Sequence, residues 1–528
     1  MSLKKYIFYC LLFLFIIVNQ SIKAQSIFVG SIGDGYLNNL QLQGKIPSNY
    51  ALTSRPFLPV KPYEYDSIYK MIDSSYHATV NFKYSFFSFR PLPATFSIKY
   101  NSDHPYGWNE GGFLSTRGIQ NKLSAGFFAT AGPLSFQFRP ELLESQNNSY
   151  VTNEFYGTSP NSRTYNKTYL GQSSLRLNAF GFSAGISSEN LYWGPGQFSA
   201  LLMSNNAPGF LHYTFNTSKP LVTPIGSFET QVVLGRLSQD TSMPFENNYL
   251  QKQPYFHFDR IYSGLNISYQ PKWVPNFFIG INRSFQYREI DMNKEGSSFT
   301  QKYLPVFDKI FKSSMGGTQE DSIPRDQEIS IFTRWLFPKT HSEFYFEYGW
   351  NDHSYNFRDF WIDPEHSAAY LVGFKHLMPV KNNKWVEISS EITQMAQTPD
   401  MLTRNAGNWY IYETGGYTND NKILGAGSGF GNNVQTIQAR LLNGFDIIGL
   451  KLQRIQQDPV AHYANWSLET IGQRPFKWTD IAIGINGQKK FSNLIISGEV
   501  QYVKSQHYAW TSSYHDNFYL LLHLNYLW

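Results

Sequence analysis

The residues from Phe518 to Trp528 alternate between two sets of positions. One set is Phe518, Leu520, Leu522, Leu524, Tyr526 and Trp528, and the other is Tyr519, Leu521, His523, Asn525 and Leu527. A period of two indicates a strand whose two faces meet different environments. An uncovered apolar strand promotes aggregation of a soluble protein, whereas a strand of about 9–11 residues with one face toward lipid is typical of a transmembrane β-barrel. We therefore expect this strand to close a barrel against a first strand near residues 79–100.

Similar strand patterns recur from about residue 79 onward. The further predicted strands are 94–100, 122–130, 134–140, 174–187, 227–237, 261–270, 276–288, 327–336, 343–350, 367–376, 384–396, 433–442, 446–455, 478–487 and 494–502. Single strands of such barrels are easily missed, and strand numbers are even. The pattern predicts an all-β membrane protein, an antiparallel transmembrane barrel of 16–18 strands formed by residues 79–528.

Long polar segments separate some of these strands. They lie near 101–118, 145–170, 238–260, 289–326, 397–432 and 456–477. Their content of Asn, Ser, Thr, Gly and Tyr is typical of solvent-exposed loops. No fixed repeat of 20–50 residues accompanies them, which argues against the alternative of a secreted propeller or solenoid.

The first 24 residues have the pattern of a secretory signal peptide. Lys4 and Lys5 precede an apolar run that is too short to span a bilayer comfortably, and cleavage is expected near Ala24. The single cysteine, Cys10, lies in that run, so the mature chain would have no disulfide, thiolate nucleophile or Cys–zinc site. We expect export to the bacterial outer membrane.

Residues 25–78 differ from the strand-rich remainder. Asp34 could cap a short helix that ends near Gly44, and Pro62 could begin a second helix. The apolar positions of the two helices are Tyr36, Leu37, Leu40 and Leu42, and Tyr65, Ile68, Tyr69 and Ile72. These residues predict a small helical element on the periplasmic side of the barrel; an ordered strap without helices is the alternative.

Composition and charge support the membrane barrel and argue against a nucleic-acid partner. The chain is 17% aromatic and 16% charged, with a mean hydropathy of −0.36. Tyr and Trp collect in the interfacial girdles of barrels, where lipid-facing residues alternate with wet ones. The formal charge of +5 falls to +2 once the three lysines of the signal segment are removed, which is too balanced for nucleic-acid binding.

Catalytic and metal-binding signatures are absent from the sequence. It has no zinc-protease, P-loop, nucleophile-elbow or EF-hand motif, and its twelve histidines form no close pair at metal spacing. His523 could act as the base of a lipase, but a polar residue facing the lumen or interface is the simpler interpretation. Glu141 and Glu144 are interpreted as solvated acids, and the glycine-rich run 425–431 as a flexible external loop. We expect no enzyme activity, no cofactor and no metal.

Residues 189–210 form the densest segment of the chain. The tight turn Trp193, Gly194, Pro195 and Gly196 follows an aromatic pair, because proline fixes φ and glycine frees it. A second rigid turn, Ser204 to Gly209, contains Asn205 and Asn206, whose amides both donate and accept. Such a segment could fold into the barrel lumen; a structural turn between two strands is the plain alternative.

These two turns resemble the signature of the Wzi-type capsule assembly proteins. The opening regions 34–42 and 53–59 are similar to the start of that family, and the segment from His104 to Gly111, with Trp108 and Asn109, also resembles it. The resemblance implies an outer-membrane barrel that retains capsular or extracellular polysaccharide. Trp193, Gly194, Pro195, Gly196, Asn205, Asn206, Trp108 and Asn109 are the candidate polysaccharide-binding or lumenal residues.

The expected partners are polysaccharide, outer-membrane lipid and the barrel assembly machinery, since residues 518–528 resemble the assembly signal of outer-membrane proteins. Tyr and Trp offer sugars a flat apolar surface with a polar group, and Asn supplies paired donors and acceptors. A porin or glycan transporter, and an enzyme that modifies lipid or glycan, remain as alternatives. If the protein is not a porin, inward-folded segments should block the lumen that 16–18 strands would enclose.

Overall fold

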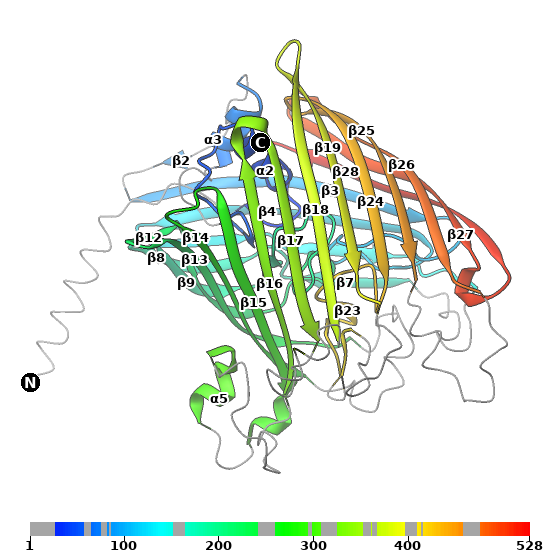
Figure 1. Ribbon diagram of the computed structural model, residues 1–528, viewed down its shortest axis with the longest axis horizontal. Helices are drawn as coiled ribbons and strands as arrows, with labels where there is room; N and C mark the ends of the chain where they lie inside the picture. Colours follow the sequence, from blue (N-terminus) through cyan, green and yellow to red (C-terminus); the bar gives the residue numbers. More distant parts are fainter. Residues whose placement is uncertain are drawn as a thin grey trace, which may run out of the picture.

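The computed structural model describes residues 27–57, 65–74, 82–83, 86–151, 164–240, 259–293, 298–307, 325–351, 361, 367–396, 409–412, 415–457 and 476–528. Within these ranges one antiparallel sheet closes on itself to form a barrel (Figure 1). Its strands are β2 (Phe82–Lys83), β3 (Phe87–Asn101), β4 (Gly118–Ala131), β5 (Leu134–Phe138), β6 (Glu141–Ser145), β7 (Tyr165–Tyr169), β8 (Ser174–Ala179), β9 (Phe182–Ser187), β11 (His212–Thr217), β12 (Leu221–Thr223), β13 (Gly226–Leu237), β14 (Arg260–Pro271), β15 (Phe277–Arg288), β16 (Asp326–Phe337), β17 (Ser342–Asn351), β18 (Ala368–Val380), β19 (Lys384–Gln394), β24 (Asn433–Asn443), β25 (Asp446–Gln456), β26 (Thr479–Phe491), β27 (Leu494–Gln506) and β28 (Tyr514–Tyr526).

Some of these strands are segments of one crossing of the barrel wall. β5 continues into β6, β7 into β8, and β11 into β12, while β2 only extends the edge of β3. The described strands therefore make eighteen antiparallel crossings. This confirms the predicted fold class and falls at the upper end of the predicted strand number.

The barrel closes where the last strand meets the first. β28 pairs with β3 in antiparallel register, from Tyr519 opposite Asn101 to Tyr526 opposite Ala94. The indole Nε1 of Trp528 continues this contact by donating to the carbonyl of Leu92 at 2.7 Å. The predicted closure of the 518–528 strand on the first strand is confirmed; we call the β28–β3 pairing the seam.

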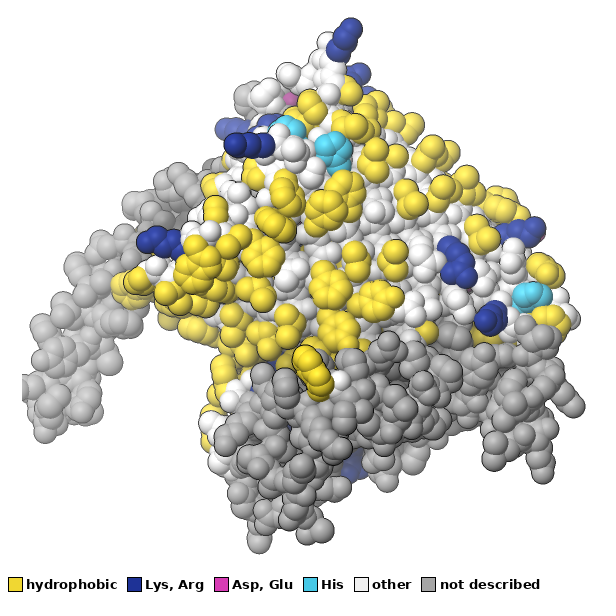
Figure 2. Space-filling view, in the orientation of Figure 1, with side chains coloured by type: hydrophobic (Ala, Val, Ile, Leu, Met, Phe, Trp, Pro, Cys, Tyr) yellow, Lys and Arg dark blue, Asp and Glu magenta, His cyan; other side chains and the backbone are white. Residues whose placement is uncertain are grey.

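The wall is apolar outside and polar inside. On β28, Phe518 is 58% exposed whereas its neighbour Tyr519 is 3% exposed and faces the lumen. The same alternation places Ile, Leu, Val and aromatic side chains on the outer faces of the other strands, and apolar side chains dominate the wall in Figure 2. This inversion of a soluble protein's pattern is expected where hydrocarbon replaces water around the wall. Among the described helices, none is both long and apolar enough to cross a bilayer.

Two details of the strand prediction were wrong. The segment 174–187 is not one strand but the hairpin β8–β9, which turns at Phe180 and Gly181, both at positive φ. Two-residue hairpin turns favour this backbone conformation. The strands at 141–145, 165–169, 212–217 and 221–223 were not predicted, because each is short and interrupted by polar or glycine residues.

The helices and the remaining short strands lie at the two ends of the barrel or inside it. They are α2 (Asp34–Leu42), α3 (Tyr65–Ile72), α5 (Phe299–Tyr303), the 3-10 helices Glu289–Asn293, Pro305–Phe307, Pro338–Thr340 and Tyr508–Trp510, and the strands β1 (Ser54–Arg55), β10 (Tyr192–Trp193), β20 (Ile411–Tyr412), β21 (Gly415–Gly416), β22 (Thr418–Asn419) and β23 (Lys422–Ile423). Short turns connect the strands at one end of the barrel, and long segments connect them at the other.

The helical element lies at the end with the short turns, beside the chain's C-terminus (Figure 1). Leu37 and Leu40 of α2 are buried in one cluster with Phe445 of the β24–β25 turn, Ile495 at the start of β27, and Leu527. α2 ends close to Gly44, as predicted, but Gly33 occupies its N-cap. Asp34 lies in the first helical turn, where its carboxylate accepts a hydrogen bond from the backbone N–H of Gly30. The predicted role of Pro62 falls outside the described residues.

Candidate functional site

The segment between β9 and β11, residues 188–211, folds into the lumen. Its first acid, Glu189, is fully buried and accepts hydrogen bonds from Arg176 at 2.7 Å and Ser187 at 3.0 Å. Trp193 then pairs with Ser54 in the small sheet β1–β10, and its Nε1 donates to Gln231 of β13 at 2.6 Å. Trp193 has no exposed side-chain surface. The segment therefore joins the barrel core, which confirms the sequence-based suggestion that it could enter the lumen.

The first turn of this segment requires glycine at two positions, because a side chain there would be strained or would collide with the backbone. Gly194 has φ +106°, and a Cβ at Gly196 would lie 1.9 Å from the carbonyl oxygen of Ser199. With the chain bent this tightly, the backbone N–H groups of Gln197 and Phe198 both point at the carboxylate of Glu391 on β19, at 2.6 and 3.1 Å. The turn is thus fixed to the barrel wall at β19 as well as at β13.

The second turn holds another inward-folded segment, residues 415–432. Ser204 donates from its backbone N–H to Leu424 at 2.7 Å and from its hydroxyl to the carbonyl of Gly425 at 2.5 Å. Asn206 donates to the carbonyl of Ile423 at 3.0 Å and is itself buried. The two segments share one apolar cluster with the wall: Leu191, Trp193, Leu201, Leu202, Met203, Ala207, Phe210, Val233, Leu237, Tyr262, Ala369, Met395, Trp409, Tyr410, Tyr417, Ile423, Leu424, Ala426 and Phe430.

The interpretation of the glycine-rich run 425–431 as a flexible external loop was wrong. Gly425 and Ala426 are buried, and a Cβ at Gly425 would lie 2.2 Å from the carbonyl oxygen of Leu201. The glycines allow close packing of two chain segments inside the barrel. Composition alone could not distinguish this use of glycine from flexibility.

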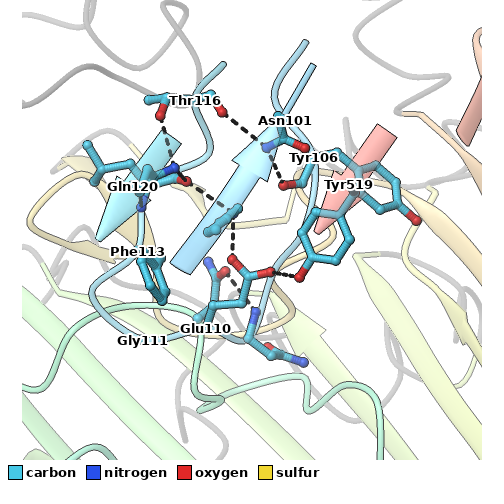
Figure 3. Close-up of polar contacts among 12 residues, drawn as sticks. Asn101, Tyr106, Glu110, Gly111, Phe113, Thr116, Gln120 and Tyr519 are labelled. Carbon is cyan, nitrogen blue, oxygen red and sulfur yellow. Dashed lines mark hydrogen bonds and ion pairs between the residues drawn. The ribbon is translucent and has the colours of Figure 1, made fainter. Parts of the chain in front are cut away.

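The segment that follows β3, residues 102–117, also folds inward, and its contacts are drawn in Figure 3. Glu110 accepts hydrogen bonds from Lys99 and from the hydroxyl of Tyr519, both at 2.5 Å. Asn101 donates to the backbone carbonyls of Tyr106 and Thr116 at 3.0 Å each. Residues of β3 and β28 thus hold this segment where the seam closes.

The two sequence segments that resemble the same family contact each other in the lumen. Asn205 donates to the backbone carbonyl of Asn109 at 3.0 Å and accepts from Asn190 at 2.7 Å, while Asn109 donates to the carbonyl of Phe198 at 2.5 Å. The backbone N–H of Gly111 donates to the carbonyl of Asn205 at 2.6 Å. Amides suit this junction because each can donate and accept at once.

A cavity of about 280 Å³ lies beside this junction. Asn109 and Asn205 line it, together with charged and polar groups of the wall such as Lys122, Arg139 and Glu141. The N-terminal residues 28–36 contribute to another part of its boundary. Two of the eight candidate residues are therefore exposed to an internal polar space.

The other candidates occupy different environments. Five of them are buried where the two segments pack together, so they cannot contact a ligand directly in this arrangement: Trp193, Gly194, Pro195, Gly196 and Asn206. Trp108 is half-buried, packs against the cluster around Tyr106 and meets the Tyr106 ring at 5.9 Å. It keeps part of its aromatic surface accessible.

The structure also places the residues considered for catalysis. Glu141 faces the lumen and lies 3.5 Å from Lys122, whereas Glu144 of the same strand is exposed on the outer face, so the two carboxylates cannot act as a pair. His523 faces the lumen, with its Nδ1 2.7 Å from the hydroxyl of Ser97. A lipase that acts on the bilayer would need its nucleophile on the outer wall. The Ser97–His523 pair lies on the lumenal face instead.

Sequence reasoning did not identify the wall residues that hold the inward segments. Gln231, Glu347 and Glu391 lie buried on three different strands and accept hydrogen bonds from residues 193–201. One signal was available, since each occupies a polar-face position within an alternating strand. Which polar residues face which turn depends on strand register, and that register requires the folded barrel.

Comparisons with known proteins agree with this architecture. The family model described as capsule assembly protein Wzi matches residues 101–473, more than two thirds of the chain. A comparison with curated proteins gave no match.

A solved structure with the same fold is also found. It is described as Wzi, an outer membrane protein involved in group 1 capsule assembly in Escherichia coli and a carbohydrate-binding β-barrel. It is 13% identical, the match covers 96% of this chain and 100% of that one, and the TM-score is 0.61. The outer membrane channel DcaP of Acinetobacter baumannii (8% identity, 85% and 99% coverage, TM-score 0.34) and OprB of Pseudomonas putida (10%, 84% and 94%, 0.37) also match.

Proposed function

The chain belongs to the Wzi family of capsule assembly proteins, and on that premise we propose that it binds capsular or extracellular polysaccharide at the cell surface without altering it chemically. The observation that carries this proposal is the junction of the two family-like segments inside an eighteen-stranded barrel. These segments fill the lumen that a porin of this size would keep open. The solved Wzi structure is described as carbohydrate-binding.

We further propose the orientation of the protein in the outer membrane. The end with the short turns and α2 faces the periplasm, and the end with the long connections faces outward, as in other bacterial barrels. A signal peptide cleaved near Ala24 would precede the helical element, 25–78, and the barrel, 79–528. The last strand would be read by the barrel assembly machinery, and the apolar wall would contact outer-membrane lipid.

Among the candidate residues, we propose Trp108, Asn109 and Asn205 as the ones that contact polysaccharide. Trp108 is half-buried and Asn109 and Asn205 line the cavity, so each retains accessible surface. The buried members, such as Trp193 and Asn206, would hold these three in position.

Binding of polysaccharide to the purified protein tests this proposal. The mature barrel in detergent is passed over immobilised capsular polysaccharide from the producing strain, and we expect saturable binding with no change in polymer length or reducing ends. Absence of binding, or shortening of the polymer that depends on the protein, would contradict the proposal. Shortening that is lost in Ser97→Ala would favour the enzyme alternative instead.

A matched pair of variants tests the role of Trp108. We expect Trp108→Ala to weaken polysaccharide binding by about tenfold or more, because an aromatic face in a partly enclosed site commonly contributes more than 1 kcal/mol. Trp273→Ala is the control, since Trp273 is 70% exposed in a short turn at the opposite end of the barrel. Equal affinity of the two variants would remove Trp108 from the binding surface.

A further inference from the structure

The long-connection end of the seam carries a cluster of metal-ligating side chains. Asp103 and His104 lie just after β3, and His515 is the second residue of β28. One oxygen of Asp103, Oδ2, lies 3.0 Å from the Nδ1 of His104 and 2.8 Å from the Nδ1 of His515. The three candidate ligand atoms lie within 4.8 Å of one another.

The surroundings fix the orientation of this cluster. The backbone N–H of Asp103 donates to Asn517 at 2.9 Å. The ring of Tyr508 packs against both imidazoles, with its centroid 4.6 Å from each. His104 is 1% exposed, whereas the side chain of Asp103 is 36% exposed and that of His515 is 19% exposed. The cluster is thus held from inside and open to solvent on one side.

A hydrogen-bond relay determines which nitrogen of His104 is available. The hydroxyl of Ser505 donates its single proton to Asp480 at 2.5 Å, so it can only accept from the Nε2 of His104, 3.1 Å away. Asp480 accepts two further hydrogen bonds, from Trp478 and Gln457 at 2.7 Å each. With the proton on Nε2, the Nδ1 lone pair of neutral His104 faces the Asp103 carboxylate.

Two electron pairs facing each other at 3.0 Å require a positive charge between them. That charge is either a second proton on His104 or a metal ion bound by Nδ1 and the carboxylate. The Asp103 side chain is 36% exposed, and an aspartate in such surroundings is ionised at neutral pH. The relay through Ser505 is the arrangement that commonly orients a metal-binding histidine.

We propose that Asp103, His104 and His515 bind a Zn²⁺ ion at the outer end of the seam. Two imidazole nitrogens and one carboxylate oxygen form a ligand set that suits zinc, with a fourth position left for water. Tetrahedral ligands at about 2.0–2.1 Å from zinc lie about 3.3 Å apart, so small side-chain rotations close this cluster around the ion. Binding displaces the proton shared with Asp103.

A bound ion would join the first and last strands of the barrel. Asp103 and His515 are 412 positions apart in the chain, and they meet only because β28 pairs with β3. Zn²⁺ binds this closed state and not the open sheet, and it therefore stabilises closure by mass action. The inference is independent of polysaccharide binding, because it rests on the seam alone.

Titration of the metal-free, full-length mature barrel with Zn²⁺ tests this proposal. The protein is held in detergent without a histidine tag, and the heat of binding is measured by calorimetry. We expect one ion per chain, and a melting temperature that rises with Zn²⁺. We expect His515→Gln to weaken the binding at least about a hundredfold and Ser505→Ala about tenfold, because the serine acts only by orienting His104.

Controls separate this site from other histidines. His376→Gln, at the short-turn end, should leave the affinity and the thermal shift unchanged. His515 is the more exposed of the two histidines, so its variant should still form a folded barrel, which a heat-dependent shift in gel mobility verifies. If the wild-type protein shows no Zn²⁺ binding, or if the double variant His104→Gln, His515→Gln binds as tightly as the wild type, the proposal is overturned.

Discussion

At the scale of single residues, the lumen depends on buried polar contacts that each have a partner on the wall. Trp193 is representative, since its ring is fully buried and its only polar atom donates to Gln231. The same oxygen of Gln231 also accepts from the hydroxyl of Ser54 at 3.0 Å, so loss of the indole N–H removes one hydrogen bond, worth about 0.5–1.5 kcal/mol, and leaves the oxygen paired. A phenylalanine at this position would keep an aromatic ring but would have no N–H group to donate.

We therefore expect two graded effects at Trp193. Trp193→Phe should lower the free energy of unfolding by about 1–2 kcal/mol, because one hydrogen bond and part of the ring packing are lost, and Trp193→Ala by about 3–5 kcal/mol because a cavity is added. Urea unfolding of the barrel in detergent, followed by tryptophan fluorescence of the remaining indoles, measures both. Equal stability of the two variants would show that the site collapses around the missing ring.

Residue-scale prediction succeeded where the local sequence carries the constraint. The first tight turn of the 189–210 segment follows from Pro195 and its flanking glycines, and Asn205 and Asn109 were each among the candidate residues. Their mutual contact, and the contact of the first turn with Glu391, depend on strands far away in the chain. No local pattern contains that information.

At the scale of elements, α2 is fixed to the barrel wall by a hydrogen bond to the buried carboxylate of a wall ion pair. Glu387 of β19 accepts hydrogen bonds from Arg440 at 2.7 Å and from Asn39 of α2 at 2.6 Å. The Glu387 side chain has no exposed surface. Removing one partner of a buried pair leaves an uncompensated charge.

We expect Glu387→Ala to destabilise the folded protein by about 3–5 kcal/mol and to make the N-terminal element accessible to protease. Lys489→Ala is the matched control, because the Lys489–Asp446 pair is more than half exposed on the lysine side and such pairs contribute about 0–1 kcal/mol. Limited proteolysis and urea unfolding report the two effects. A protease-resistant element in Glu387→Ala would show that its apolar packing suffices.

Replacing the inward segment 188–211 tests whether it closes the lumen. Ser187 and His212 are directly paired, so residues 188–211 can be replaced by a short turn without moving β9 or β11. We expect this variant to show conductance steps in planar bilayers that the wild type lacks, since an eighteen-stranded wall encloses a wide space. Steady, large conductance of the wild type would favour the porin alternative.

A second replacement controls for loop removal in general. Ser145 and Tyr165 are also paired, and residues 146–164 can be shortened in the same way. Among the described residues, that segment contributes nothing to the lumenal cluster. Its variant should conduct no more than the wild type.

Element prediction worked because alternation with period two is a strong signal in lipid-facing strands. It merged β8 with β9, since a two-residue turn hardly interrupts an alternating pattern. It missed short strands such as β7, where Asn166 and Lys167 conceal the pattern. The inward folding of 415–432 was also missed, because polar composition is shared by exposed loops and by segments whose polar groups are satisfied inside a barrel.

At the scale of the whole molecule, closure of the seam brings together residues from the two ends of the chain. The strand 518–528 predicted this closure, but the cluster at Asp103, His104 and His515 could not be seen from histidine spacing. The same closure positions Tyr519 against Glu110 and so holds the 102–117 segment. One pairing thus connects assembly of the barrel with the arrangement of its interior.

The central claim is that this barrel retains polysaccharide at the cell surface. The most direct measurement is the fraction of capsular polysaccharide that sediments with the cells in a deletion strain, with and without the gene supplied in trans. We expect the deletion to release polysaccharide into the medium with little change in the total amount, and the wild-type gene to restore retention. An unchanged cell-associated fraction in the deletion strain would contradict the claim.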